Sequence, residues 1–153
     1  DDEGYCNFFT SRTYDPNAWP PYLNGPGNKD IIFNELLIDW EREVTLVEGV
    51  FDAIVAGENS IPLLGSTLRE DSNLFRKIVK NDTPVLLGLD DDAHKKAMKL
   101  VRALLAHDVE VRLMDTSGHK DIGEMSSEVF ENRKEKASFI DSDAYLLKVA
   151  LMA

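Results

Sequence analysis

The sequence contains a single cysteine, Cys6, among its 153 residues. One cysteine cannot form a disulfide within the chain, and without cysteine or histidine neighbours it cannot build a structural zinc site. The absence of a disulfide framework favours a reducing compartment. We therefore predict a cytoplasmic protein.

Long apolar stretches are also missing from the sequence. No run of about 18 or more apolar residues occurs, so no membrane-spanning helix and no membrane partner are expected. The opening residues, DDEGYCNFFTSR, have neither a basic start nor an apolar centre, and we expect no secretory signal there. Because this opening has no methionine, we interpret it as the tail of something longer.

Basic residues are few compared with acidic ones. The 17 lysines and arginines face 28 aspartates and glutamates, which gives a formal net charge of -11 at pH 7. Broad electrostatic binding of nucleic acid depends on Lys and Arg that neutralise phosphates, so this charge argues against a simple nucleic-acid binder. Acidic clusters that hold Mg²⁺ can still serve an enzyme of nucleic acid, because the metal meets the phosphate. The net charge therefore argues less strongly against a metal-dependent enzyme of nucleic acid than against a simple nucleic-acid-binding protein.

What the sequence does contain is enough apolar material, 43% of its residues, for the core of one domain. Short β-branched runs alternate with segments of helical periodicity from residue 44 onward. The expected strands are 44–49, 61–66, 84–90 and 110–115, and the helices that follow the first three are 50–59, 70–80 and 93–107. This rhythm predicts an α/β fold with a central, mostly parallel four-stranded sheet flanked by helices.

Two further segments flank the domain that we assign to residues 44–125. Residues 1–43 are predicted to form an irregular arm, rich in proline, glycine and aromatics, and then a lead-in helix over 31–42. In the helix over 50–59, we expect Phe51, Ile54 and Val55 to point inward. Residues 126–153 are predicted to form two helices that pack on the domain, the second one with a cap-like Asp141 or Ser142.

Acidic side chains follow the first and the third expected strand. VTLVEGVFD places Glu48 at a strand end and Asp52 one turn into the next helix, while PVLLGLDDD ends in three aspartates. Carboxyl ends of parallel strands meet at one edge of a sheet, and Asp90 and Asp92 point to the same side of it. Carboxylate oxygens suit Mg²⁺, so we predict a divalent-metal site there. The alternative is that the aspartates only cap the following helix.

Four motifs in order and spacing resemble those of a Toprim domain: EGVFD, LLGST, LGLDDD and HKDIGE. The upstream segment PYLNGPGNKDIIFN is similar to the YLNSP-type segment that precedes Toprim in DnaG-type bacterial and phage primases. The resemblance covers about residues 20–125. It implies a Toprim-like, Rossmann-like sandwich and a primase that joins nucleoside triphosphates into an RNA primer on single-stranded DNA.

The resemblance also implies roles for individual residues. Glu48 would be the general acid or base of phosphoryl transfer, and Asp90 and Asp92 would be metal ligands, which makes these three the catalytic set. The implied cofactor is Mg²⁺ or Mn²⁺, with two ions bound. The implied metal site consists of Glu48, Asp52, Asp90, Asp92 and Asp121, with Glu124 as a further candidate.

Three basic residues are candidates for contacts with nucleotide phosphates. Lys95 shares one helical face with Lys99 and Arg102 and lies near the acids, although a solvated helix face is the alternative for it. Arg12 and Lys29 lie in the amino-terminal arm.

The chain departs from the primase pattern in several places. Lysines that usually precede the Tyr-Leu-Asn segment and follow the next Ile-Phe are replaced by Pro21 and Asn34. The zinc-binding module, the basic part of the polymerase core and a helicase domain are absent from the sequence, so we expect a fragment or a compact phage-type version. A replicative helicase is a possible partner by the same resemblance. Two alternatives stay open: a Toprim nuclease or topoisomerase-type cleavage enzyme, and a non-catalytic metal-binding interaction module.

Overall fold

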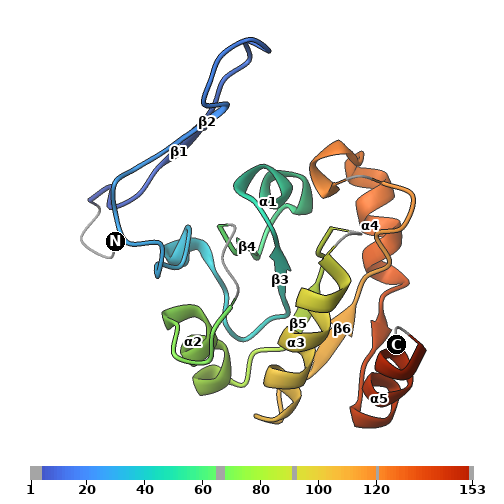
Figure 1. Ribbon diagram of the computed structural model, residues 1–153. Helices are drawn as coiled ribbons and strands as arrows, with labels where there is room; N and C mark the ends of the chain where they lie inside the picture. Colours follow the sequence, from blue (N-terminus) through green and yellow to red (C-terminus); the bar gives the residue numbers. More distant parts are fainter. Residues whose placement is uncertain (1–4, 65–67, 91–92, 120, 152–153) are drawn as a thin grey trace.

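The computed structural model describes residues 5–64, 68–90, 93–119 and 121–151 (Figure 1). At its centre lies a sheet with the strand order β4-β3-β5-β6-β7. Strands β3 (Val44–Val47), β4 (Ser60–Pro62), β5 (Val85–Leu87) and β6 (Val111–Leu113) run parallel, and β7 (Ser138–Phe139) is antiparallel to β6. The predicted mostly parallel α/β sheet is confirmed, but it has a fifth strand, because a two-residue edge strand has too little periodicity to be seen in a sequence.

The order of the strands creates a switch point in the sheet. Strand β3 pairs with β4 on one side and with β5 on the other. After β3, the chain adds β4 on one side of it. It then crosses to the other side of β3 and adds β5 and β6 there. In open α/β sheets, ligands bind beyond the carboxyl ends of the strands at such a reversal.

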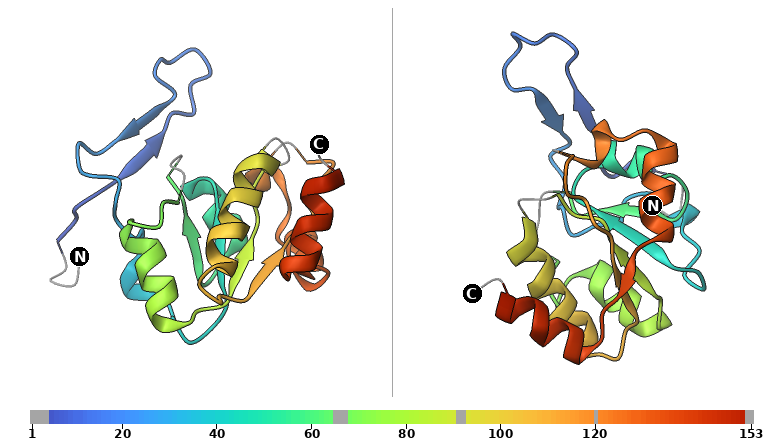
Figure 2. Two further views of the ribbon diagram at one scale, coloured as in Figure 1. Left: turned by 60° about the horizontal axis from the view of Figure 1, so that its bottom comes forward. Right: turned by 90° about the vertical axis from the view of Figure 1, so that its right-hand side faces the viewer.

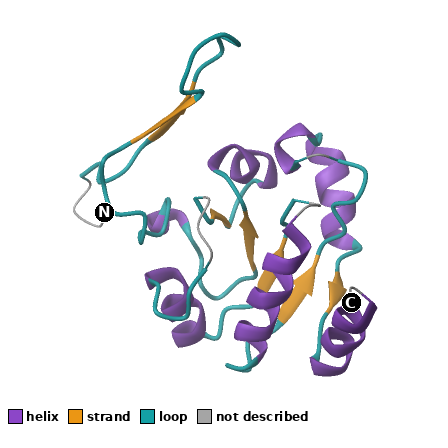
Figure 3. Cartoon of the chain, viewed as in Figure 1, coloured by secondary structure: helices purple, strands orange, loops and turns teal. Residues whose placement is uncertain are grey.

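Helices cover both faces of the sheet (Figures 2 and 3). One face carries α1 (Val50–Ala56) and α4 (Ser127–Glu135), which contact each other. The other face carries α2 (Asn73–Asn81), α3 (His94–Leu105) and α5 (Ser142–Leu151), and α5 lies against α3. Every predicted helix after residue 44 is present, with ends that differ by a few residues.

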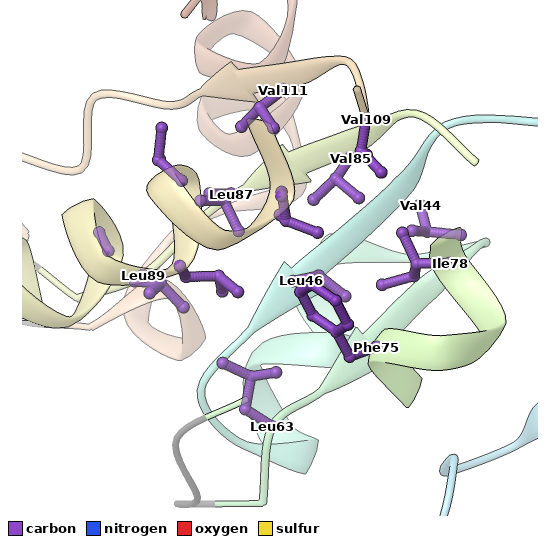
Figure 4. Packing of buried hydrophobic residues seen from close by; sticks show 14 of the residues in the cluster. Val44, Leu46, Leu63, Phe75, Ile78, Val85, Leu87, Leu89, Val109 and Val111 are labelled. Carbon is purple, nitrogen blue, oxygen red and sulfur yellow. The ribbon is translucent and has the colours of Figure 1, made fainter. Parts of the chain in front are cut away.

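The core consists of two clusters, one on each face of the sheet. Val44 and Leu46 of β3 face α2 and α3, where they pack with Phe75 of α2 (Figure 4). Val47, on the opposite side of the same strand, packs instead with Phe130 of α4. Side chains alternate along a strand, so burial of both sets makes the strand apolar throughout. This double burial explains why the strands have continuous apolar sequences.

The helix predicted over residues 31–42 was wrong. Only Glu35–Leu37 are helical, as the short 3-10 helix η1, and Asn34 before it has a left-handed φ of 56°. The rest of the segment is held by the side chain of Asn59, which accepts from the N–H of Asp39 at 2.8 Å and donates to the carbonyl of Glu43 at 2.9 Å. These bonds occupy backbone groups that a helix would pair internally.

Helix α1 also differs from its prediction. It ends at Ala56 because Gly57, with φ 76°, and Asn59, with φ 56°, leave the helical region of backbone space. Ile54 was predicted to point inward, but 70% of it is exposed. A helix this short presents only one narrow face to the sheet, and Ala56 and Asp52 take it.

The carboxy-terminal helices lie on the sheet domain. The carboxylate of Asp141 caps α5 by accepting from the N–H of Ala144 at 2.7 Å, and Ala144 and Tyr145 pack against the larger core cluster. Leu146 and Leu151 of the same helix remain exposed. Within the part of the chain that the structure describes, no helix is both long and apolar enough to cross a membrane.

The amino-terminal arm contains a hairpin that projects from the body of the molecule (Figure 1). Its strands β1 (Thr10–Arg12) and β2 (Tyr22–Asn24) are antiparallel, with Arg12 opposite Tyr22. Near the base of the hairpin, Phe8 is buried. The hairpin thereby carries a polar and aromatic strand pair to one side of the sheet edge.

Candidate active site

An open cavity lies at the carboxyl ends of β3 and β5. Its volume is about 800 Å³, and the lining includes the acids Glu48, Asp52, Asp90, Asp121 and Glu124. Glu48 directly follows β3, and Asp90 lies three residues beyond the end of β5. The two strands are paired next to this edge, since the N–H of Gly88 donates to the carbonyl of Leu46 at 3.0 Å. The cavity therefore coincides with the switch point of the sheet.

Among the residues that the structure describes, no donor reaches one buried oxygen of Glu48 and one buried oxygen of Asp90. These atoms are Oε1 of Glu48 and Oδ1 of Asp90, whereas Oε2 of Glu48 lies 3.6 Å from Nζ of Lys96. Burying an ionised oxygen without a partner is costly, and a divalent cation is the partner that carboxylates commonly take. The donor set therefore fits a metal ion.

Helix capping does not account for the carboxylate of Asp90. The residue at the N-cap of α3 is Ala93, which has no side-chain cap, and it is the backbone carbonyl of Asp90 that accepts from the Ala93 N–H at 2.9 Å. Asp90 instead lines the cavity.

The acids at this edge affect one another electrostatically. Burial, followed by the nearby charges of Glu48, Asp52 and Asp121, raises the pKa of Asp90 to about 6, while the N–H of Ile122 acts in the opposite direction. Crowded carboxylates disfavour the charged form, and a cation between them reverses that effect. Near neutral pH, a bound cation would therefore stabilise the charged forms of these acids.

Asp52 joins two loops of the site. Its Oδ2 accepts from the N–H of Gly49 at 2.7 Å, and its Oδ1 accepts from the N–H of Gly123 at 3.0 Å. The side chain is buried, and burial is the main reason that the pKa of Asp52 is raised. Because both oxygens already accept hydrogen bonds, Asp52 is better suited to position the other acids than to bind metal alone. Its predicted role as a ligand stays a prediction.

Asp121 reaches the cavity from the loop after β6. It caps the 3-10 helix η3 (Ile122–Glu124), where its Oδ1 accepts from the N–H of Glu124 at 3.0 Å. A Cβ on Gly123 would lie 3.1 Å from Oδ1 of both Asp121 and Asp52. Glycine at this position thus allows the loop to approach the two carboxylates closely.

Lys96 was not among the predicted site residues. It lies on α3 and is partly buried beside Glu48, whereas the predicted Lys95 is exposed, and neither lysine lines the cavity. The helical spacing could have identified Lys96. It lies three residues after Ala93 and four before Leu100, on the same face of the helix, and both of those residues pack on the core. Lys95 belongs to the solvent-facing side of the helix.

Basic and aromatic side chains from the amino-terminal arm and α1 also line the cavity. Arg12 and Lys29 line the cavity together with Tyr22 and Phe51. The guanidinium carbon of Arg12 lies 5.5 Å from the centre of the Tyr22 ring and 5.9 Å from that of Phe51, and the ring centres are 6.1 Å apart. Sequence analysis placed Phe51 inward in its helix and assigned a functional role to neither ring. The lining of the cavity therefore combines the acids with the cations Arg12 and Lys29.

The predicted site residues are thus distributed as follows. Six of them line this one cavity, Lys95 does not, and Asp92 lies outside the described residues. Among the side chains that the structure describes, no group of three or more His, Cys, Asp or Glu is arranged as a ready metal site. Mg²⁺ needs only one or two carboxylates when waters and substrate phosphates supply the other oxygens. The six that line the cavity are Glu48, Asp52, Asp90, Asp121, Arg12 and Lys29, and the further candidate Glu124 lines it as well.

Comparisons with known proteins bear on the fold. A scan against models of protein families finds no match, and a search of curated proteins finds none either. Among solved structures, the chain is similar to the crystal structure of the Aquifex aeolicus primase, which comprises its zinc-binding and RNA polymerase domains. The TM-score is 0.67 and the sequence identity 21%, and the match covers 92% of this chain but only 39% of the primase chain. The chain therefore has a primase-like fold.

Proposed function

We propose that this chain is the catalytic Toprim portion of a DNA primase, which makes RNA primers on single-stranded DNA by metal-dependent nucleotidyl transfer. The observation that carries the proposal is the pair of buried, unpartnered oxygens on Glu48 and Asp90 at the switch point of the sheet. The similarity of the fold to a bacterial primase supports it. Nucleoside triphosphates and single-stranded DNA are the proposed substrates.

Glu48 and Asp90 would hold Mg²⁺ or Mn²⁺, with Asp121 and Asp92 as further ligands of a pair of ions. When bound, the metal supplies charge neutralisation for the triphosphate and activation of the attacking hydroxyl. The residues present fit this group, because two buried carboxylate oxygens lack any other partner.

Glu48 would also act in proton transfer. Lys96 lies 3.6 Å from Oε2 of Glu48, which leaves Oε1 as the oxygen without a partner. Lys96 would hold the carboxylate in one orientation, and Glu48 would exchange a proton with the reacting hydroxyl as the general acid or base.

The cations of the cavity would bind the substrate's phosphates. Arg12 and Lys29 line the same cavity as the acids, so a triphosphate bound there would meet these cations as well as the metal. This arrangement orients the substrate and supports transfer chemistry, which depends mainly on positioning and charge stabilisation.

The proposal is tested by primer synthesis. The full chain is incubated with nucleoside triphosphates, a single-stranded DNA template and Mn²⁺ or Mg²⁺, and a labelled DNA is included to detect cleavage. We expect primer synthesis, and we expect Glu48→Gln and Asp90→Asn to reduce it by about 10² or more, as for removal of a catalytic group. Asp143→Asn, on the exposed side of α5, is the matched control and should retain activity.

Two results would count against the proposal. Cleavage of the labelled DNA without primer synthesis would assign the same acids to a nuclease. Absence of both activities, combined with Mn²⁺ binding that Asp90→Asn abolishes, would leave a non-catalytic metal-binding interaction module in place of an enzyme.

A further inference from the structure

We infer that the rings of Phe51 and Tyr22 form the platform on which the base of a bound nucleotide stacks. The inference rests on the proposed function and extends it to residues for which neither the sequence nor the similarity of fold supplied a role. It assigns the aromatic part of the cavity to the nucleobase and the charged part to the phosphates.

The two rings reach the cavity from different elements. Phe51 lies in the first turn of α1, three residues after Glu48, while Tyr22 comes from β2 of the hairpin. Both line the same cavity as the acids, and Tyr22 is 45% exposed. A nucleotide whose phosphates lie near Glu48 would therefore have an aromatic surface within reach of its base.

Apolar surface continues beside the rings. Ile54, one turn after Phe51 on α1, is 70% exposed, and Ile54, Val55 and Leu64 also line the cavity. Apolar side chains at the mouth of a cavity gain from any flat apolar group that covers them. A nucleobase has such a surface on its two faces.

The geometry of the rings restricts how a base can bind. The ring planes of Tyr22 and Phe51 are inclined at 55°, so a base cannot lie parallel to both and must stack on the open face of one of them. Arg12 lies over both rings, at 5.5 and 5.9 Å from their centres, so a base would stack on a ring face that Arg12 leaves free. A cavity of about 800 Å³ has room for a whole nucleotide.

Stacking of this kind has a consequence for specificity. Every base offers a π-face, so a stacking platform accepts all four nucleotides and favours the larger purines over pyrimidines. This behaviour suits an enzyme that must take its nucleotides in the order that a template dictates.

The test compares ligands with and without a base. Equilibrium binding of Mg-ATP, Mg-CTP and Mg-tripolyphosphate to the full chain is measured for the wild type, Phe51→Leu and Tyr22→Leu. Leucine keeps an apolar side chain at each position but removes the π-face. We expect each variant to bind ATP about tenfold more weakly, CTP less affected, and tripolyphosphate unchanged. Phe51→Trp should restore ATP binding.

Tyr14→Leu is the matched control, because Tyr14 lies on the same hairpin but is fully exposed and does not line the cavity. If Phe51→Leu and Tyr22→Leu weaken the binding of ATP and of tripolyphosphate equally, the rings serve only to hold the hairpin in place. The inference is then overturned. Unchanged ATP binding in both variants overturns it as well.

Failure of the proposed function gives a different pattern. If Asp90→Asn leaves the binding of Mg-tripolyphosphate unchanged, the metal-phosphate assignment fails whatever the ring variants show. If Asp90→Asn weakens binding of both ligands while the ring variants change neither, only the base platform fails.

Discussion

Two carboxylates, Glu48 and Asp90, form the chemical centre of the molecule at the scale of single residues. Each keeps one oxygen buried and without a hydrogen bond. Such atoms are rare in folded proteins because they cost free energy, and they are found where a ligand or a reaction needs them. For Asp90, burial and the neighbouring acids raise the pKa to about 6, which means that its charged form is disfavoured in the metal-free protein.

The raised pKa of Asp90 predicts a dependence of stability on pH. The folded protein holds the Asp90 proton up to about pH 6, whereas the unfolded chain releases it near 3.8. The folded state therefore binds more protons between these values, and the stability of the metal-free protein falls as pH rises through this range. Asp90→Asn removes this ionisation. We expect Asp90→Asn to unfold at a higher temperature than the wild type at pH 7.5, with a much smaller difference at pH 4.

Thermal unfolding followed by circular dichroism in EDTA measures this difference. Repeating the measurement with Mg²⁺ is the control, since only the wild type should be stabilised by the metal and the difference should shrink or reverse. If the wild type and Asp90→Asn unfold at the same temperature at pH 7.5 in EDTA, the raised pKa of Asp90 is contradicted.

At the scale of elements, the site depends on how short helices and loops are joined at the sheet edge. Helix α1 and the 3-10 helix η3 belong to distant parts of the chain and contact each other. Asp52 joins them through the N–H groups of Gly49 and Gly123. The loop that carries Asp121 is therefore placed by a residue of α1.

Asp52→Ala should destabilise the fold for this reason. Its removal leaves two backbone N–H groups without partners, and each partly buried unpaired donor costs about 1–3 kcal/mol, less the relief of the burial penalty on Asp52 itself. We expect the free energy of unfolding to fall by roughly 2–4 kcal/mol in urea denaturation. Glu131→Ala, on the exposed side of α4, is the control and should change it by less than about 0.5 kcal/mol. Unchanged stability with loss of metal binding would instead make Asp52 a direct ligand.

Arg112 of β6 explains a second feature at this scale, the unpredicted edge strand. Its guanidinium donates to both oxygens of Glu43 at 3.2 Å, to the carbonyl of Lys134 at 2.7 Å and to that of Ala137 at 3.3 Å. It thereby fixes the end of α4 next to β6, and the chain emerges in position to form β7.

At the scale of the whole molecule, the net charge of -11 opposes contact with nucleic acid. The two cations of the cavity, Arg12 and Lys29, are local exceptions. Contact with single-stranded DNA should therefore depend on divalent metal.

Fluorescence anisotropy of a labelled single-stranded oligonucleotide measures this dependence. In EDTA at about 150 mM salt we expect no binding, because few cations are available to neutralise phosphates. Added Mg²⁺ should produce binding, and Asp90→Asn should lose this gain. NaCl at the same ionic strength is the control. Binding that is as tight in EDTA as in Mg²⁺ would contradict the prediction.

The sequence alone determined the features that depend on local pattern. Apolar runs of strand length and helices of 3.6-residue period identified the α/β sheet, and each acid could be located at a strand end because that position is a property of a few neighbouring residues. The parallel sheet and the positions of Glu48, Asp52, Asp90 and Asp121 could therefore be predicted, since parallel strands present their carboxyl ends at one edge.

Only the tertiary structure decided what depends on contacts between distant residues. The apolar spacing of residues 31–42 indicated a helix, but the side chain of Asn59 holds that segment in another form. The partner of Glu48 was Lys96 and not Lys95, because the packing of α3 sets which lysine faces the sheet edge. The rings of Tyr22 and Phe51 meet although they are far apart in the chain. Local pattern cannot report such pairings, because their free energy arises only when separate elements pack together.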